Sequence, residues 1–277
     1  MAIKDPETIK QIVRSNFDKS VKLYENFERK YSLFEYLTLE LARVCKIRKG
    51  MNVCDIGCGT GSSSFMLAKI VGNEGKVIGV DFSEKMLDLA QEKLKSFSSS
   101  NIEFILCDAD AIEENINFKL DSVLYNACIF LIPEPIKTLQ SAYKILKENG
   151  TVGMNYLIGM YEKSDKTDNG LFQLAKRDGK EFAPYGRKIV DINIISDSLD
   201  KVGFRNIRKG TIAKEMSLNE MREFYSIPAQ SAALYPKTPY EDRLNLIDTL
   251  MDYVQKKKIR KLYQCWGWYA AEKFLFS

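Results

Sequence analysis

The sequence predicts an α/β protein, in which a mostly parallel sheet is covered by helices on both faces. Between residues 51 and 158, short apolar segments of strand length alternate with segments whose apolar residues recur at helical spacing. Strands that alternate with helices form crossover units, which set the strands parallel and cover both faces of the sheet. With 277 residues, 45% hydrophobic and 28% charged, the chain is long enough to bury a full core.

The first residues are expected to form two helices before residue 48. Asp5 is a predicted N-cap, and Pro6 suits the first helical position because that position needs no backbone N–H donor. Apolar residues then recur at helical spacing, at Ile9, Ile12, Val13, Phe17, Val21, Tyr24 and Phe27. Residues 1–47 are therefore predicted to form an N-terminal helical cap.

The alternating segments define a predicted core over residues 48–158. Strands are predicted over residues 51–57, 75–81, 102–108, 120–130 and 151–158. The helices between them are predicted over residues 61–72, 83–97 and 135–150.

After residue 158 the alternation weakens. A polar segment over residues 159–188 precedes a predicted helix and strand within residues 192–210. The helical segment that follows, over residues 218–261, is interrupted by Pro228, Pro236 and Pro239. We expect residues 159–262 to form a C-terminal half with a helical insertion, and residues 263–277 to supply an aromatic-rich closing strand.

The stretch VCDIGCGTG, residues 53–61, carries the strongest functional signal. Its three glycines lie where a strand ends and a helix begins, so the turn can approach a ligand closely. Ligands of an open parallel sheet lie beyond the carboxyl ends of the strands. Asp81 ends the next predicted strand, where its carboxylate could accept hydrogen bonds from a ribose diol. The stretch predicts a site for an adenosine-containing cofactor.

The spacing of these residues narrows the choice of cofactor. The loop lacks the lysine of a phosphate-binding P-loop, and Gly57, Gly59 and Gly61 do not have the G-x-G-x-x-G spacing of NAD sites. Asp55, just before the glycines, would repel a pyrophosphate but suits the ammonium group of an amino acid. S-adenosylmethionine has such an ammonium group, and NAD does not.

Four motifs in order resemble those of class I S-adenosylmethionine-dependent methyltransferases. VCDIGCGTG resembles the first motif of that family, GVDFSEKML the second and FILCDAD the third, while LDSVLYNACIFLIPEPIKTLQSAYKILKENGTVGM resembles the fourth strand, a helix and the fifth strand. The likeness covers about residues 5 to 158. It is nearest to the ubiquinone/menaquinone C-methyltransferase type and related small-molecule methyltransferases.

This resemblance implies both a fold and a reaction. The fold would be a Rossmann-like, mostly parallel seven-stranded sheet, with N-terminal helices and a helical lid insertion before the last strand. The reaction would move a methyl group from S-adenosyl-L-methionine to a small, fairly apolar acceptor, leaving S-adenosyl-L-homocysteine.

The resemblance also implies a set of residues at the cofactor, which lie in the quoted motifs or in the helix before them. They are Tyr24, Asp55, Gly57, Gly59, Thr60, Gly61, Asp81, Phe82, Met86, Asp108, Ala109 and Asn126. Asp55 and the glycine loop would hold the methionine part, with Asn126 beside it. Asp81 would bind the ribose.

At the adenine, Phe82 and Met86 would flank the ring, Asp108 would meet the amino group and Ala109 would offer a backbone donor. Asp110 is an alternative to Asp108. Tyr24 would close over the cofactor, with Tyr31 and Tyr36 as companions, although these tyrosines could equally be packing residues.

The chemistry of the transfer is less defined by the sequence. The chain has no histidine, which excludes a histidine base and the commonest zinc ligand. The remaining candidates for a base are Tyr125, Tyr156, Tyr161, Tyr185 and acidic residues of the insertion. Because the sulfonium is already activated, alignment of the reacting groups could supply ~7–11 kcal/mol of the barrier.

The six cysteines indicate reduced thiols rather than a disulfide framework. Most lie in apolar segments, and Cys54 and Cys58, which flank the glycine loop, are predicted to be packing residues rather than metal ligands. We expect no metal site, and a cytoplasmic location. The first residues lack an apolar segment of signal-peptide length, and no apolar run approaches the ~20 residues of a membrane span.

The acceptor is predicted to be a small molecule. Phe130 and Leu131 follow the fourth strand, which favours an apolar pocket. Residues 160–190 and 217–258 could form a lid, to which Phe224, Tyr225, Leu234 and Tyr235 would contribute; a fixed helical buttress is the alternative.

Two other functions remain open on the sequence. The net charge of +4 gives little support to an enzyme acting on RNA or protein, and the basic tract 256–261 is expected to be a solvated helix face. A non-catalytic protein that binds the cofactor is the other alternative, since fold does not fix function. The oligomeric state is not predicted.

Overall fold

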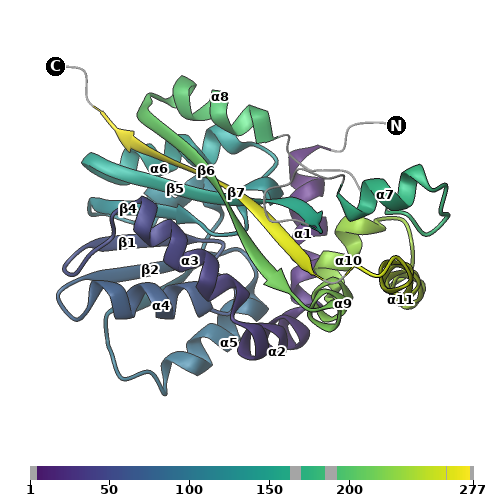
Figure 1. The fold of residues 1–277 in the computed structure, drawn as a ribbon. Helices are drawn as coiled ribbons and strands as arrows, with labels where there is room; N and C mark the ends of the chain where they lie inside the picture. Colours follow the sequence, from purple (N-terminus) through teal and green to yellow (C-terminus); the bar gives the residue numbers. More distant parts are fainter. Residues whose placement is uncertain (1–4, 163–169, 185–191, 260, 275–277) are drawn as a thin grey trace.

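The computed structural model describes residues 5–162, 170–184, 192–259 and 261–274, and its centre is a seven-stranded sheet (Figure 1). The order is β3-β2-β1-β4-β5-β7-β6. The strands are β1 Asn52–Ile56, β2 Lys76–Asp81, β3 Ile102–Leu106, β4 Leu120–Tyr125, β5 Leu146–Tyr161, β6 Phe204–Met216 and β7 Leu262–Lys273. β1 to β5 are parallel, whereas β7 is antiparallel to its neighbours β5 and β6. The predicted fold class, a mostly parallel seven-stranded α/β sheet, is confirmed.

Helices cover both faces of the sheet, because neighbouring residues of each buried strand point to opposite sides. On β4, Leu124 packs in a cluster with α3 Leu33–Val44 and α4 Ser62–Val71. The preceding residue, Val123, packs on the other face with α6 Pro135–Ile145 and α8 Ile192–Val202. α5 Glu84–Leu94 contacts β2 and β3, and its N-cap Ser83 accepts a hydrogen bond from the backbone N–H of Met86 at 3.3 Å.

The N-terminal cap consists of three helices rather than the predicted two. They are α1 Pro6–Asp18, α2 Val21–Tyr31 and α3. The chain breaks at Lys19 and Ser20, within the apolar run from Ile9 to Phe27, and again at Ser32, whose left-handed φ of 48° ends α2. The buried carboxylate of Glu28 then caps α3, accepting hydrogen bonds from the backbone N–H groups of Phe34 at 3.0 Å and Glu35 at 2.9 Å. As predicted, Asp5 caps α1 and accepts from the backbone N–H of Thr8 at 3.0 Å.

The fourth strand is shorter than the predicted segment 120–130. β4 ends at Tyr125, because the chain turns at Ala127, which has a left-handed φ of 56°. Residues Ile129–Leu131 form a short 3-10 helix, η2. The segment after the strand is therefore a loop at the carboxyl edge of the sheet, where it is free to contact a ligand.

A second core lies beyond the carboxyl edge of the sheet, beside α1 and α2 (Figure 1). Its helices are α7 Leu171–Arg177, α9 Leu218–Ser226, α10 Pro228–Leu234 and α11 Tyr240–Lys256. We call it the C-terminal core; its buried members are Phe27, Leu33, Phe34, Leu37, Met160, Leu171, Ala175, Met216, Met221, Phe224, Tyr225, Ile227, Leu234, Tyr235, Ile247, Leu250, Met251, Tyr253, Val254, Leu262 and Trp266. Pro228 begins α10 and Pro239 precedes α11, so these prolines separate helices as predicted.

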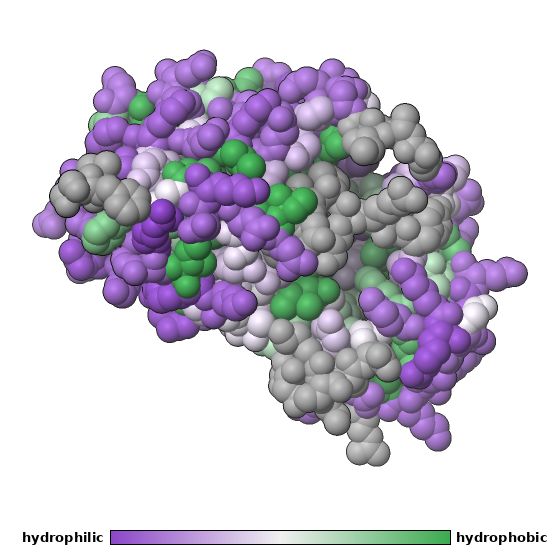
Figure 2. Space-filling view, turned by 90° about the horizontal axis from the view of Figure 1, so that it is seen from above, coloured by the Kyte–Doolittle hydropathy of each residue, from purple (hydrophilic) through white to green (hydrophobic). Residues whose placement is uncertain are grey.

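The surface is mixed in character. Figure 2 shows a largely hydrophilic face on which apolar patches are separated from one another. Within the described part of the chain, no helix is long and apolar enough to cross a membrane.

Candidate active site

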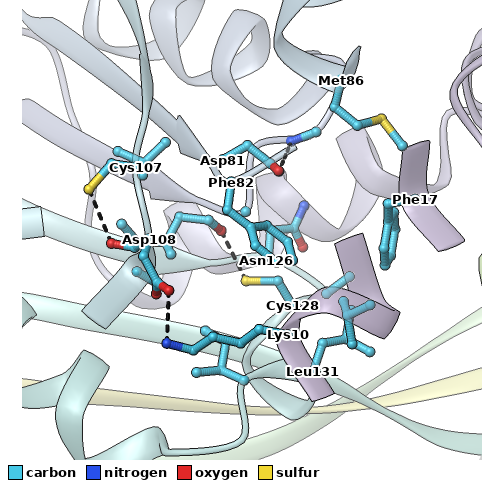
Figure 3. Close-up of a pocket in the computed structure, with 18 of the residues that line it drawn as sticks. Lys10, Phe17, Asp81, Phe82, Met86, Cys107, Asp108, Asn126, Cys128 and Leu131 are labelled. Atoms are coloured by element: carbon cyan, nitrogen blue, oxygen red, sulfur yellow. Dashed lines mark hydrogen bonds and ion pairs between the residues drawn. The ribbon is translucent and has the colours of Figure 1, made fainter. Parts of the chain in front are cut away.

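A cavity opens at the carboxyl edge of the sheet, beyond the ends of β1, β2 and β4 (Figure 3). It contains about 800 Å³ of space, part of which is open to solvent. Nine of the twelve residues predicted to bind the cofactor line it, namely Tyr24, Gly57, Gly59, Asp81, Phe82, Met86, Asp108, Ala109 and Asn126. The fold thus brings together residues from four separate motifs and the N-terminal cap.

The glycine loop uses left-handed backbone conformations that other residues rarely adopt. φ is 68° at Gly57, 54° at Gly59 and 86° at Gly61. A Cβ atom at Gly57 would lie 2.7 Å from the Cβ atom of Cys128, so this position is closed by packing. At Gly59 the nearest atom would be a ring carbon of Tyr24 at 3.9 Å. Only Gly59 therefore leaves room beside the backbone on the side of the cavity.

Gly61 does not line the cavity. A Cβ atom there would lie 2.9 Å from the rings of both Phe65 and Phe104. Its place before α4 lets the helix pack closely on the sheet, which is a structural role.

Asp81 ties the glycine loop to the end of β2. Its Oδ2 atom accepts a hydrogen bond from the backbone N–H of Gly59 at 2.9 Å, and Oδ1 accepts from that of Ser83 at 2.8 Å. Burial raises the pKa of this carboxyl group, and the backbone donors, which favour the ionised form, oppose the rise. Each carboxylate oxygen keeps further lone pairs, so Asp81 can still accept hydrogen bonds from a ligand in the cavity.

Asp55 and Thr60 lie behind the loop and do not line the cavity. Asp55 is 1% exposed, and its Oδ2 atom accepts a hydrogen bond from the Ser64 hydroxyl group at 2.7 Å. Its Oδ1 atom and the Oγ1 atom of Thr60 are buried and have no hydrogen bond within the described residues. Burial raises the pKa of Asp55 to about 7, and the nearby Asp81 adds to the rise. A buried carboxyl group with an unused oxygen favours a cationic donor as its partner.

The side-chain amide of Asn126 is occupied by the protein itself. Its Nδ2 atom lies 3.0 Å from the backbone oxygen of Phe34, and 2.8 Å from the hydroxyl oxygens of both Thr38 and Ser63. Its Oδ1 atom accepts a hydrogen bond from Nδ2 of Asn155 at 2.6 Å. Asn126 thus lines the cavity while fixing the loop after β4 to α3, α4 and β5.

At the other end of the cavity, the structure favours Asp108 over Asp110 as the predicted cofactor residue. Asp108 lines the cavity, and its side chain is 38% exposed against 12% for Asp110. Both carboxylates accept a hydrogen bond from Nζ of Lys10, at 2.8 Å for Asp108 and 2.7 Å for Asp110. Figure 3 shows the bond to Asp108. Burial would lower the pKa of Lys10, but the bonds to both carboxylates raise it on balance, so Lys10 is charged.

Helix α1 supplies a wall of the cavity that sequence reasoning missed. Lys10, Val13 and Phe17 all line the cavity. Their spacing of three and four residues places them on one helix face, and this was the available signal. Cys128 was also missed; its thiol lines the cavity and donates to the backbone oxygen of Ile56 at 2.9 Å.

The tyrosines of the N-terminal cap differ from one another. Tyr24 lines the cavity and stacks on Phe34, with ring centroids 4.8 Å apart. Tyr31 and Tyr36 do not line it: the Tyr31 hydroxyl accepts a hydrogen bond from Asn219, and Tyr36 is 36% exposed. Contrary to the expectation, these two do not accompany Tyr24 at the cavity: Tyr31 lies about two turns farther along α2, and Tyr36 lies on α3.

The three described tyrosines among those named as possible bases do not line the cavity. Tyr125 is fully buried, and its hydroxyl donates to the backbone oxygen of Thr138 at 3.0 Å on the α6 side of the sheet. Tyr156 stacks on Tyr269, and burial raises its pKa to about 12. Tyr161 ends β5, and its ring lies beside Gly159. Tyr185 lies outside the described residues.

The loop after β4, which is predicted to lie at the acceptor, is apolar. Leu131, Ile132 and Pro133 line the cavity, while Phe130 packs against Trp266 with ring centroids 6.5 Å apart. The residues predicted for a lid, namely Phe224, Tyr225, Leu234 and Tyr235, do not line the cavity and are buried in the C-terminal core.

Comparisons with known proteins agree with this geometry. A family described as a methyltransferase domain matches residues 47–220. Demethylmenaquinone methyltransferase of Listeria welshimeri is 32% identical over 146 residues, which cover 52% of this chain and 61% of that protein. The match thus spans less than two thirds of that relative's length.

Two solved structures share the fold. Phosphoethanolamine N-methyltransferase 2 of Haemonchus contortus, in complex with phosphomonomethylethanolamine and S-adenosylhomocysteine, has a TM-score of 0.56 at 19% identity and covers 93% of this chain and 58% of its own. The [4+2]-cyclase SpnF has a TM-score of 0.53 at 18% identity, over 87% of this chain and 81% of its own. At such identities the likeness concerns the fold alone.

Proposed function

Since the chain belongs to the methyltransferase-domain family, we propose that it is an S-adenosylmethionine-dependent enzyme that methylates a small, fairly apolar molecule. The observation that carries the proposal is the convergence of the glycine loop, Asp81 and Asp108 on one cavity at the carboxyl edge of the sheet. A nucleoside with an amino-acid tail fits the chemistry at both ends of that cavity.

The amino-acid end of the cofactor fits the buried polar atoms behind the loop. The unpaired Oδ1 atom of Asp55 and the unpaired Oγ1 atom of Thr60 lie in the segment that holds the glycines. An ammonium group would supply the missing donor for Asp55 and offset the cost of burying its charge. The room beside Gly59 would admit the tail close to the backbone.

The adenosine end fits Asp81, Asp108 and the apolar side chains between them. Asp81 would accept hydrogen bonds from the ribose hydroxyls, and Asp108 from the adenine amino group. Phe82 and Met86 would enclose the base, and Ala109 would offer its backbone N–H. Tyr24 and Phe17 lie on the same cavity and would exclude water from it.

The cofactor, when bound, supplies a methyl group on a positively charged sulfur that needs no further activation. The protein would then act mainly by alignment, holding the acceptor in line with that methyl group. The chain has no histidine, and Tyr125 and Tyr156 do not line the cavity. We therefore propose in-line displacement without a histidine base or a metal, on an acceptor whose reacting atom carries no proton or loses it readily.

The acceptor is proposed to be a small apolar ring compound. The apolar residues after β4 support this proposal, and so does the similarity to a demethylmenaquinone methyltransferase. We propose that α9–α11 form a fixed buttress for the N-terminal helices rather than a mobile lid, because their aromatic residues are buried in the C-terminal core.

A non-catalytic role in binding the cofactor is the second candidate. It is favoured by one observation, namely that the described tyrosines named as bases are absent from the cavity lining. The fold alone does not decide between the two, since a cyclase shares it.

Calorimetry and a labelled-transfer assay would test the proposal. The purified protein should bind S-adenosylmethionine and S-adenosylhomocysteine, and should move label from methyl-labelled S-adenosylmethionine into the low-molecular-weight fraction of a cell extract. Failure to bind either compound would overturn the proposal. Binding without transfer would favour the non-catalytic role, and label in RNA or protein would identify a macromolecular acceptor.

A further inference from the structure

Two buried polar atoms in the C-terminal core have no hydrogen bond within the described residues. They are Oη of Tyr225 on α9 and Nε2 of Gln264 on β7. Tyr225 is 2% exposed and Gln264 is fully buried. Buried polar groups in folded proteins are nearly always paired, so two such atoms together indicate a partner that the described residues do not supply.

The orientation of the Gln264 amide is fixed by its neighbour. Its Oε1 atom accepts a hydrogen bond from the indole N–H of Trp266 at 3.0 Å. An indole nitrogen can only donate, so the amide cannot be flipped without losing this bond. The group left unpaired is therefore the N–H donor of Gln264.

The Tyr225 hydroxyl group lies beside this amide. Burial raises the pKa of Tyr225, and the neighbouring amide of Gln264 opposes the rise. If the amide donated to the hydroxyl oxygen, the hydroxyl hydrogen would still have no acceptor. The pair therefore presents uncharged donors, and the partner that suits them is an oxygen atom.

The surroundings of the pair are aromatic. The ring of Tyr225 lies 5.0 Å from that of Phe224 and 5.6 Å from that of Phe172. Such surroundings favour a partner that is otherwise apolar, because a second charged or polar group would be left unpaired there.

The pair also lies on the side of the fold where the cavity opens. Gln264 pairs with Met160, near the carboxyl end of β5, so it occupies the same edge of the sheet as the glycine loop. Tyr24 and Ala127, which line the cavity, pack against the C-terminal core, as does Phe130. The core and the cavity are thus continuous through these three side chains.

We propose that Tyr225 and Gln264 bind a carbonyl or phenolic oxygen of the methyl acceptor, and so orient its apolar ring toward the cavity. This inference rests on the proposed function, because the ring is taken to be that of the methyl acceptor. Tyr225 and Gln264 act as specificity-determining residues. Phe130 and Tyr24, which pack against the C-terminal core, would part to admit the ring.

The stability of Tyr225→Phe is the first test. The variant removes an unpaired hydroxyl group, so its thermal midpoint should be unchanged or higher than that of the wild type. Tyr253→Phe is the matched control: Tyr253 is in the same core, but its hydroxyl donates to Asp178 at 2.7 Å, so its loss should lower the midpoint. A lower midpoint for Tyr225→Phe would show an internal partner and overturn the proposal.

Binding of a matched pair of probes is the second test. 2-Naphthol carries a phenolic oxygen, and 2-methylnaphthalene replaces it by a methyl group of similar size. The wild type should prefer 2-naphthol by about tenfold, which corresponds to the ~1.4 kcal/mol of one hydrogen bond. Tyr225→Phe should lose most of that preference, and Tyr253→Phe should retain it. The proposal is wrong if the wild type shows no preference or if Tyr225→Phe keeps it.

The same titrations separate this inference from the proposed function. They would be made with and without S-adenosylhomocysteine, whose own affinity should be equal in the wild type and in Tyr225→Phe. If the wild type does not bind S-adenosylhomocysteine, the proposed function fails, whatever the probes show. If it binds S-adenosylhomocysteine but Tyr225→Phe does not change the probe preference, only the inference about Tyr225 and Gln264 fails.

Discussion

The cavity and the C-terminal core are adjacent but are built in opposite ways. One wall of the cavity is formed by the left-handed turn at Gly57 and Gly59 and by Asp81, held by hydrogen bonds such as that from Gly59 to Asp81. The C-terminal core is filled by large side chains, including Phe224, Tyr235 and Trp266. The first kind of construction needs particular residues at a fixed spacing, whereas the second needs only volume and shape. This difference explains why motifs reveal one region and not the other.

The largest expected effect concerns the C-terminal core. Phe224 is 1% exposed, and its ring lies 5.4 Å from that of Phe27 on α2. Phe224→Ala should lower the free energy of unfolding by about 3–5 kcal/mol, as measured by urea denaturation, because it leaves a cavity. Affinity for S-adenosylhomocysteine should stay within about twofold, since Phe224 does not line the cavity.

Leu23→Ala on α2 is the control for this variant. Leu23 is 43% exposed, so the change should cost less than about 0.5 kcal/mol. A large loss of cofactor affinity in Phe224→Ala would mean that the two regions are coupled and that the comparison above is too simple.

A smaller effect is expected at the carboxylate of Asp81. Asp81→Asn can accept only one of the hydrogen bonds that Gly59 and Ser83 now donate, and it removes a charged acceptor for the ribose. We expect S-adenosylhomocysteine affinity to fall by about 1.5–3 kcal/mol in calorimetry.

The matched control for Asp81→Asn lies at the other end of the sheet. Asp121 also accepts a hydrogen bond from a strand backbone, that of Asn52 at 2.8 Å, but at the amino edge. Asp121→Asn should change stability and leave the affinity unchanged. Equal affinity losses in both variants would show that Asp81 acts only through the stability of the sheet.

The smallest expected effect is a pH dependence of stability and of S-adenosylhomocysteine binding, which arises from the carboxyl group of Asp55. Its pKa is raised to about 7 in the folded protein, so protonation favours the folded state, and stability conferred by the proton is lost as pH rises from about 4 to about 7. An ammonium ligand prefers the ionised form. Binding of S-adenosylhomocysteine should therefore release about half a proton at pH 7 and strengthen from pH 6 to pH 8. Calorimetry in buffers of different ionisation enthalpy measures this release.

The variant Asp55→Asn should abolish the release of the proton. A proton release that persists in Asp55→Asn would assign it to another group and remove the argument for Asp55 as the partner of the ammonium.

The sequence predicted β1 to β5 and nine of the cofactor residues that line the cavity, because strand ends and glycine turns are set by local residues. The sequence did not predict on which face of the sheet a side chain lies. Tyr125 and Asn126 are adjacent, yet the first lies against α6 and the second against α3. The break at Lys19 and Ser20 was missed for a related reason: the hydroxyl group of Ser20 accepts a hydrogen bond from the distant backbone N–H of Ala229 at 2.9 Å. The contact of Lys10 with Asp108 joins residues 98 positions apart, and no local pattern reports it.

The bonds of Asn126 have a consequence for how this region can evolve. One side chain joins the backbone of Phe34 and the hydroxyls of Thr38 and Ser63 to the amide of Asn155, so α3, α4, β4 and β5 meet in a single polar group. A substitution at this position would leave buried hydrogen-bonding groups without a partner in several elements at once. In descendants of this sequence, Asn126 and Asn155 must therefore change together or not at all.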